Sequence, residues 1–202
     1  MKLYYSPLAC SLADHIALEE AGVVYEREAV DLKTKRTASG GDFSKITPKA
    51  YVPVLVIEDG EVLTENVAVL DWIASQHPHL AVPGALGRTR MLEALTYVTT
   101  ELHHGFKPMW HGGSEEEKAL ARTTLAAKLA FVAGTMRGAY LFGDEPSVAD
   151  FYLFVMLLWA QRFNVATPPE LATLASRMKA RPAVQRALQQ EGLRQEAVMS
   201  QD

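Results

Sequence analysis

The fold is decided by one stretch near the start of the chain, Leu3-Tyr4-Tyr5-Ser6-Pro7-Leu8-Ala9-Cys10-Ser11-Leu12. The apolar run before Ser6 predicts a strand, and Pro7 ends it. Apolar residues then recur at helical spacing from Leu12 to Gly22, which predicts a helix. The one cysteine of the 202-residue chain therefore lies where a strand passes into the first turn of a helix.

Two interpretations of Cys10 follow from this position. Free backbone N–H groups and the positive end of the helix dipole favour an anion there. On this interpretation, the pKa of the thiol lies below its ordinary value near ~8.5 and Cys10 is reactive. On the other, Cys10 is a small buried side chain, as most unpaired cysteines are.

Composition excludes several classes of protein. Hydrophobic residues make up 49% of the chain, charged residues 22%, and the formal net charge is −4, which does not favour a nucleic-acid partner. A single cysteine excludes an intrachain disulfide. Pro7 and Asp14 interrupt any signal-peptide core, and the longest apolar run, 151–160, is too short to span a membrane. We therefore expect a cytoplasmic protein with no membrane partner.

The first part of the chain alternates strand and helix patterns. Strands are predicted over 23–30, 52–57 and 61–63, the last two joined by an Asp59-Gly60 hairpin turn. A short helix is predicted over 43–46, and Thr64-Glu65-Asn66 opens a longer one. The polar segment 31–36 is predicted as a loop. This order predicts an α/β domain over 1–78, with a sheet that is part parallel and part antiparallel.

The second part of the chain shows only helical patterns. A linker is predicted over 79–86, followed by an all-helical domain over 87–202. Helices are expected over 88–106, 115–136, 147–163, 170–179 and 183–190, and a frayed tail over 195–202. The helix 147–163 is apolar almost all round and should be the buried centre of a bundle. Ser147 is the expected N-cap, with Asp150 reaching back to it.

Five segments of the sequence, in chain order, resemble segments of one known protein family. They are Tyr5-Ser6-Pro7-Leu8-Ala9-Cys10-Ser11-Leu12, Val52-Pro53-Val54-Leu55, Leu63-Thr64-Glu65-Asn66-Val67-Ala68, Glu101-Leu102-His103-His104-Gly105-Phe106 and Ser147-Val148-Ala149-Asp150-Phe151-Tyr152-Leu153-Phe154. Together they resemble the glutathione S-transferases, and among these the bacterial beta class. The resemblance implies a thioredoxin-like N-terminal domain, a C-terminal helical bundle domain, glutathione as co-substrate and a homodimer.

The resemblance also implies roles in binding glutathione. Pro53 is implied to be cis, and Val52 to pair its backbone with the cysteinyl unit. Glu65 would accept from the ligand ammonium, and Asn66 would bind the γ-glutamyl carboxylate. Lys35 would bind the glycyl carboxylate, a role for which Lys33 and Arg36 compete. The residues alone allow plainer roles, in which Pro53 starts an edge strand, Asn66 caps a helix and the charged side chains are solvated.

The catalytic candidates are residues that could contact the sulfur of glutathione. The position three after Cys10 is Ala13, so a second thiol must come from a small molecule, and glutathione supplies one. Cys10 either forms a mixed disulfide with glutathione or hydrogen-bonds its thiolate, and Ser11 and Tyr5 are the other candidates for contact with the sulfur. By resemblance His103 faces the same sulfur; otherwise it is an interfacial histidine.

Three departures from the family pattern bear on glutathione binding. The family usually has glutamine at Tyr51, often asparagine at Thr96 and often lysine at His104. His104 remains a candidate binding residue, but no metal site is expected, because adjacent helical residues point about 100° apart. We expect the electrophile against Leu8, Phe106, Trp110 and Phe163.

Two functions are compatible with this sequence. The first is conjugation of glutathione to a small hydrophobic electrophile, with possible thiol–disulfide or peroxidase chemistry through Cys10. The second is a non-catalytic ligand-binding or interaction protein that keeps the same fold. Cys10, Val52-Pro53 and Glu65 together favour the enzyme, while Tyr51, Asn66 and His104 favour the binding protein.

Overall fold

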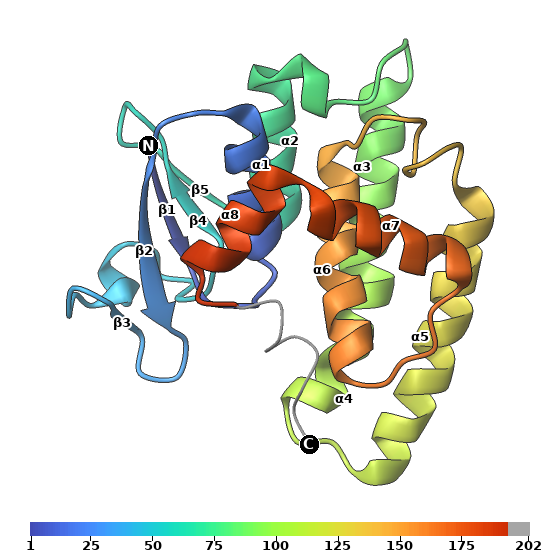
Figure 1. Cartoon of the computed structure of the whole chain (residues 1–202). Coiled ribbons are helices and arrows are strands. Elements are labelled where there is room, and N and C mark those ends of the chain that lie inside the picture. The colour runs from blue at the N-terminus through green and yellow to red at the C-terminus, as the bar shows by residue number, and fades with distance from the viewer. Residues whose placement is uncertain (194–202) are drawn as a thin grey trace.

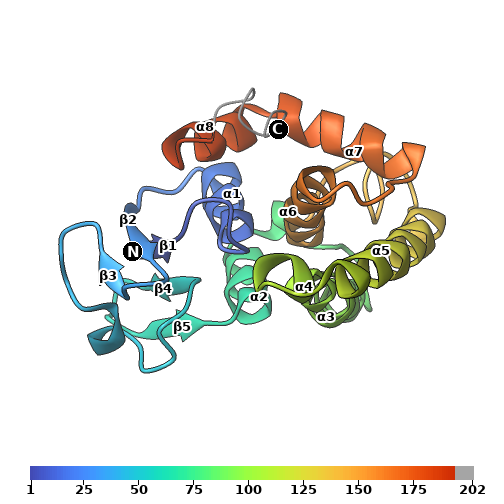
Figure 2. The same ribbon diagram turned by 90° about the horizontal axis from the view of Figure 1, so that it is seen from below.

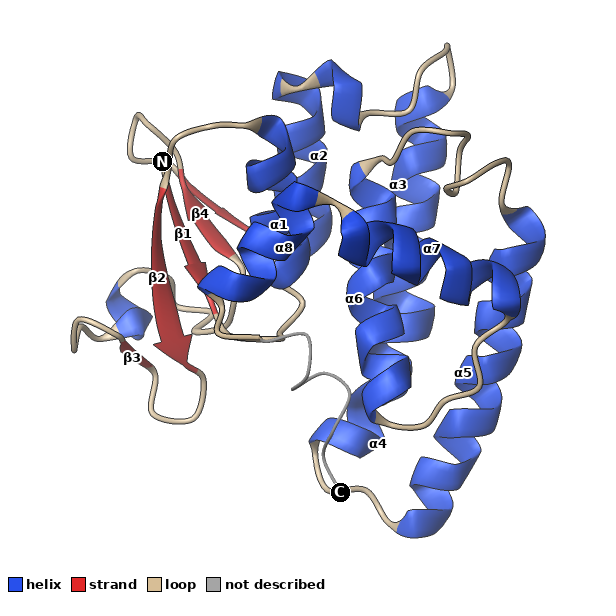
Figure 3. Ribbon diagram, in the orientation of Figure 1, coloured by secondary structure: helices blue, strands red, loops and turns tan. Residues whose placement is uncertain are grey.

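A five-stranded mixed sheet forms the first half of the computed structural model, which describes residues 1–193 (Figure 3). Its strands are β1 (Lys2–Tyr5), β2 (Glu26–Asp31), β3 (Arg36–Thr37), β4 (Val54–Val56) and β5 (Val62–Thr64). They lie in the order β3-β2-β1-β4-β5, and β1 and β2 are parallel while the other neighbours are antiparallel. The predicted mixed sheet is confirmed. The short β3 was missed, and the tail predicted over 195–202 lies outside the described residues.

Two helices cover one face of this sheet and separate it from the helical half of the molecule (Figure 2). They are α1 (Leu12–Ala21) and α2 (Asn66–Gln76). Gly22 ends α1 at φ 67°, and Gly60 turns the β4–β5 hairpin at φ 88°; both are conformations that glycine adopts without strain. A short 3₁₀ helix, η1 (Phe43–Lys45), packs Phe43 against the small second core cluster of the sheet, which contains Tyr4, Val30, Val52 and Val54.

The second half of the described chain is helical. Its main helices are α3 (Gly87–Tyr97), α5 (Glu115–Thr135), α6 (Val148–Arg162), α7 (Pro169–Ala180) and α8 (Pro182–Gln190), and a 3₁₀ turn, η2 (Pro78–Leu80), precedes them. Every residue of α6 from 148 to 160 is buried, which confirms the predicted central helix. No helix within residues 1–193 is both long and apolar enough to cross a membrane.

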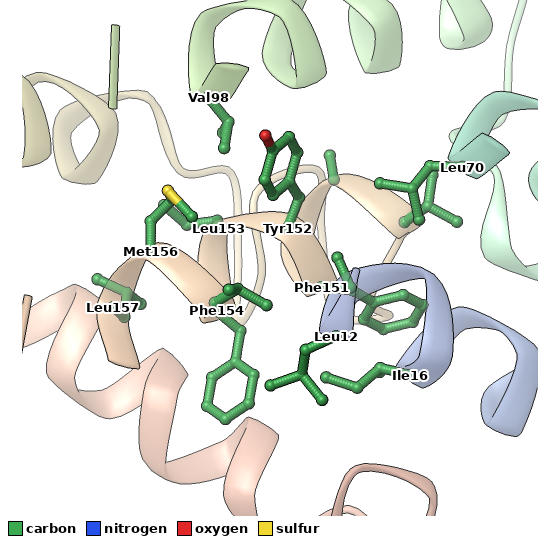
Figure 4. Packing of buried hydrophobic residues seen from close by; sticks show 14 of the residues in the cluster. Leu12, Ile16, Leu70, Val98, Phe151, Tyr152, Leu153, Phe154, Met156 and Leu157 are labelled. Atoms are coloured by element: carbon green, nitrogen blue, oxygen red, sulfur yellow. The ribbon is translucent and has the colours of Figure 1, made fainter. Parts of the chain in front are cut away.

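The two halves share one hydrophobic core. α6 packs against α1, α3 and α7, and α8 packs against α1 (Figure 1). Leu12 and Ile16 of α1 lie beside Phe151 and Phe154 of α6 (Figure 4). Burying one such side chain stabilises a fold by about 1.5–3 kcal/mol. The strand-to-helix loop that carries Cys10 is therefore fixed by the helical half as well as by the sheet.

The helix predicted over 88–106 is present, but its hydrogen-bond pattern changes along its length. α3 ends at Tyr97, a π-helical turn η3 (Val98–His103) and a 3₁₀ turn η4 (His104–Phe106) follow, and α4 (Lys107–Trp110) completes the run. The hydroxyls of Thr99 and Thr100 donate to the carbonyls four residues earlier, at 2.9 and 3.0 Å. Such back-bonding competes with the helical ladder and bends helices. His103 therefore lies in a π-helical turn and His104 in a 3₁₀ turn.

Candidate active site

Cys10 lies at the junction of three elements. Its Sγ atom donates to the Val52 carbonyl at 3.7 Å, and its own carbonyl accepts from Asn66 Nδ2 at 3.1 Å. Val52 precedes Pro53 through a cis peptide bond, as the resemblance implied. Cys10, in the loop after β1, therefore contacts the loop before β4 and the first turn of α2.

Of the two interpretations of Cys10, its surroundings favour the unreactive thiol. Burial raises the pKa of the thiol to about 12, and the Glu65 carboxylate, together with the Asp14 carboxyl once it is ionised, adds to this increase. Backbone N–H groups at the start of α1 act in the opposite direction, as the helix-terminus argument predicted, but their effect is smaller. At neutral pH the Cys10 side chain is therefore a thiol, which can donate a hydrogen bond.

The hydroxyls of Ser11 and Tyr5 hold backbone groups in place. Ser11 Oγ accepts from the Ser6 N–H at 3.2 Å and donates to the Ser6 carbonyl at 3.5 Å, so it closes the loop before α1. The Tyr5 hydroxyl donates to the carbonyl of Gln190 at 3.4 Å, at the end of α8. Neither hydroxyl is hydrogen-bonded to Cys10 Sγ in the described part of the chain, and both serve the loop and the contact between the two halves.

Glu65 carries a preformed set of polar contacts at the start of α2. Its Oε1 atom accepts from the Tyr51 hydroxyl at 2.6 Å and pairs with the Lys49 ammonium. Lys49 also donates to Thr64 Oγ1 at 2.9 Å. The hydrogen bonds from Lys49 and Tyr51 lower the pKa of the Glu65 carboxyl, which is therefore ionised at neutral pH. Lys49 was not anticipated, because no local pattern links it to a residue sixteen positions later.

Two predicted binding groups are engaged within the protein. Lys35, at φ 57°, donates its ammonium to the Ala50 carbonyl at 2.9 Å. The Asn66 side chain is buried, and its amide donates to Cys10 rather than facing solvent. Asn66 Oδ1 is also buried and has no hydrogen-bond partner within residues 1–193.

His103 is bonded to a residue that the sequence did not single out. Its Nδ1 atom lies 2.6 Å from the hydroxyl of Tyr152 on α6, and its ring meets that of Trp159 edge to face with the centroids 5.0 Å apart. Burial lowers the pKa of His103 to about 4 and raises that of the Tyr152 phenol. We assign the phenol as donor to Nδ1, which places the imidazole proton on Nε2. His104 beside it is exposed.

Three of the four residues expected to receive an electrophile form one aromatic cluster, Phe106, Trp110 and Phe163, in which Phe106 is fully buried. Phe163 lies 4.8 Å from Trp110 and 6.2 Å from Phe106 between ring centroids, and Trp110 lies 5.2 Å from Trp159. Trp159 Nε1 donates to the carbonyl of Leu8 at 2.8 Å, which joins this cluster to the Cys10 loop. Trp159 was not predicted, because only its place in the fold distinguishes it from other apolar residues of α6.

A buried polar network attaches the end of α8 to the same loop. His15, on α1, lies with Nδ1 3.0 Å from Glu191 Oε1 and Nε2 2.7 Å from Gln190 Oε1. The second oxygen of Glu191 accepts from the Leu8 N–H at 3.0 Å. Leu8, whose φ is 59°, is therefore hydrogen-bonded at its N–H by Glu191 and at its carbonyl by Trp159. No sequence spacing could reveal contacts that join residues 176 positions apart.

Asp14 is a further buried acid near the site. It is fully buried on α1, one helical turn after Cys10, and neither of its carboxylate oxygens has a hydrogen-bond partner within residues 1–193. Burial raises the pKa of Asp14 well above its ordinary value. Residues 1–193 contain no group of three or more histidine, cysteine or acidic side chains placed to hold a metal ion.

Comparison with known proteins assigns the whole arrangement to one family. Residues 9–76 match the family model of the glutathione S-transferase N-terminal domain, and residues 91–182 match that of the C-terminal domain. The chain belongs to the glutathione S-transferase family. The glutathione S-transferase GstA of Escherichia coli O157:H7 is 39% identical over 201 residues, which cover 96% of this chain and 100% of that protein.

Solved structures of glutathione S-transferases agree with this assignment. BphK, a bacterial member solved as a ternary complex, is 44% identical with a TM-score of 0.90. A sphingomonad enzyme complexed with glutathione is 40% identical with a TM-score of 0.89, and the beta-class enzyme of Sphingomonas chungbukensis is 40% identical with a TM-score of 0.88. Each alignment covers 96% of this chain and 100% of the other. The thioredoxin-like domain with an appended helical domain, and the beta-class resemblance, are confirmed.

Proposed function

We propose that this protein is a glutathione transferase that conjugates reduced glutathione to small hydrophobic electrophiles. The observation that carries the proposal is the arrangement around Cys10, whose thiol bonds the Val52 carbonyl and whose carbonyl bonds Asn66, the residue after Glu65. Glutathione offers a thiol, a peptide backbone and a charged γ-glutamyl group, and each has a chemical counterpart here. The sphingomonad relative with bound glutathione supports the same choice of ligand.

The binding groups for glutathione are distributed over three loops. The Val52 N–H has no acceptor within residues 1–193, so it is available to a peptide carbonyl. Glu65 keeps Oε2 for a ligand ammonium, since Lys49 and Tyr51 both use Oε1. Lys35 reaches the glycyl carboxylate after releasing the Ala50 carbonyl. A charged ligand group replaces a neutral acceptor in that exchange, which strengthens the hydrogen bond.

Thiolate formation on glutathione is favoured by the backbone N–H groups of Cys10 and Ser11, just before α1. They stabilise an anion, and the Cys10 thiol donates to the glutathione sulfur in place of the Val52 carbonyl. The thiolate then attacks the electrophile that packs on the aromatic cluster, and proximity supplies much of the acceleration. His103, neutral and protonated on Nε2, acts as a hydrogen-bond donor rather than as a base. A thiol pKa of about 12 disfavours thiol–disulfide or peroxidase chemistry through Cys10.

The test compares Glu65→Ala with Glu61→Ala, an acid exposed on the β4–β5 hairpin. We expect Glu65→Ala to weaken glutathione binding about tenfold or more, because a charge-assisted hydrogen bond is lost, and to change the melting temperature little. Calorimetric titration and conjugation of a chlorodinitrobenzene measure the effect. Equal affinity in the two variants would contradict the role of Glu65. A wild-type protein that binds a hydrophobic dye but no glutathione would instead support the non-catalytic binding protein.

The assembly and the compartment are also proposals. We infer a homodimer in the cytoplasm, as the family resemblance implies and as two-fold dimers predominate among soluble oligomers. Analytical ultracentrifugation tests the assembly, and a single species with the mass of one chain would contradict it.

A further inference from the structure

One edge of the aromatic cluster carries a positive charge. The guanidinium carbon of Arg162, the last residue of α6, lies 5.6 Å from the ring centroid of Trp110 and 6.0 Å from that of Phe163. Trp110 is 39% exposed and Arg162 is exposed, so this edge faces solvent. Cation–π contacts with two rings fix the position of the guanidinium at the edge.

Among residues 1–193, no acidic side chain neutralises the charge of Arg162. No carboxylate within residues 1–193 forms an ion pair with it. A guanidinium in cation–π contact keeps its N–H groups, which form a fork that matches a carboxylate. Arg162 therefore lies beside the two rings and retains its capacity to bind an anion.

A second guanidinium adds to the positive potential at the end of α6. Arg122, on α5, donates Nε to the Phe163 carbonyl at 3.1 Å. Two arginines thus flank Phe163, one at its ring and one at its backbone, in a chain whose net charge is −4. Glu115, at the start of α5, interacts electrostatically with Arg122, so the charge that remains for an anionic ligand at this edge is that of Arg162.

We propose that Arg162 makes the electrophile site selective for aromatic electrophiles that carry an anionic group such as a carboxylate. This inference rests on the proposed function and names the substrate class for that site. The ring of the electrophile packs on Trp110 and Phe163, and its carboxylate pairs with the Arg162 guanidinium. In a conjugation with an aryl chloride, the glutathione thiolate forms a carbon–sulfur bond at the ring, the carbon–chlorine bond breaks, and chloride leaves with the electron pair. The thiol proton passes to solvent.

The test uses two probes, a chlorodinitrobenzene and its carboxylated analogue, a chlorodinitrobenzoate. The quantity measured is the ratio of kcat/KM for the carboxylated probe to that for the neutral probe, each divided by its uncatalysed rate with glutathione. We expect Arg162→Gln to lower this ratio about twofold to fivefold, as the loss of an exposed ion pair would. Arg162→Lys should retain part of it, and added salt should lower the ratio in the wild type.

Arg177→Gln is the matched control. Arg177 donates to the Ala139 carbonyl near the opposite end of α6, so its loss removes the same charge at a distance from the cluster. An unchanged ratio in Arg162→Gln, or an equal fall in both variants, would overturn the inference while leaving the proposed function in place. A wild-type protein that conjugates neither probe would instead contradict the proposed function itself.

Discussion

Asp14 lies in α1, fully buried, and both of its carboxylate oxygens are without a hydrogen-bond partner in the described part of the chain. An unsatisfied buried polar group destabilises a fold by about 1–3 kcal/mol. Burial, followed by the charge of Glu191, raises the pKa of Asp14 well above its ordinary value. The folded state therefore holds a proton on Asp14 that the unfolded chain loses more readily, so this residue lowers stability as pH rises.

This assignment predicts the pH dependence of an Asp14→Ala variant. Wild-type stability relative to the variant should fall as the pH rises from about 5 to about 8, because the wild type must bury a charge or keep its proton. Urea denaturation at both pH values measures the difference, and subtraction of the two proteins removes the common effects of His103 and Asp150. Parallel pH profiles for wild type and variant would contradict the account, and the exposed Glu58→Ala serves as control.

The pKa of Cys10 is likewise determined by the individual residues around it. The strand-to-helix position of Cys10 and the anion-favouring N–H groups were predicted from the sequence, and both are present. The raised pKa was not, because the burial of Cys10 against the hydrophobic core depends on tertiary packing. Contacts local in sequence predict which groups are near a thiol, but only the fold determines how much water surrounds it.

At the scale of elements, α6 depends on one cap. Asp150 is fully buried and its carboxylate accepts from the Leu141 N–H at 2.8 Å and from the N–H and hydroxyl of Ser147 at 2.9 Å each. The Ser147–Asp150 part was predicted from sequence, since a capping box is local. The bond to Leu141 ties the preceding loop to the same carboxylate, so one side chain fixes both the loop and the start of the central helix.

Asp150→Ala should lower the free energy of unfolding by about 3 kcal/mol, because three buried donors lose their acceptor. Urea denaturation measures the loss, and Asp150→Asn, which keeps one acceptor oxygen, should lose less. The matched control is Ser114→Ala at the exposed capping box of α5, for which about 1 kcal/mol is expected. A loss for Asp150→Ala no larger than that of the control would show that the cap is unimportant.

The π-helical and 3₁₀ turns after α3 could not be predicted from the sequence. Apolar spacing from residue 88 onward fits one continuous helix, and the same residues are indeed buried along one face, namely Leu95, Leu102 and Phe106. The change to π-helical hydrogen bonding at Val98 coincides with the back-bonding of Thr99 to the Leu95 carbonyl. Periodicity carries no information about such a change, because the backbone stays helical.

At the scale of the whole molecule, the Cys10 loop is held by both halves of the chain. Glu191 and Trp159, both from the helical half, bond the N–H and the carbonyl of Leu8. Val52 and Asn66, from the first half, bond Cys10 itself. The site is thus a product of long-range packing, which explains why the sequence predicted the residue types but not His103–Tyr152, Lys49–Glu65 or His15–Glu191.

The central claim is that Cys10 remains a thiol while the site converts bound glutathione to its thiolate. The most direct test is a titration of ultraviolet thiolate absorbance, for the protein alone and with saturating glutathione. The account predicts no thiolate step below about pH 9 for the protein alone, because burial raises the pKa of Cys10 to about 12. With glutathione it predicts a step at a lower pH than for glutathione in solution. A thiolate step near neutral pH without glutathione, or an unshifted step with it, would contradict the account.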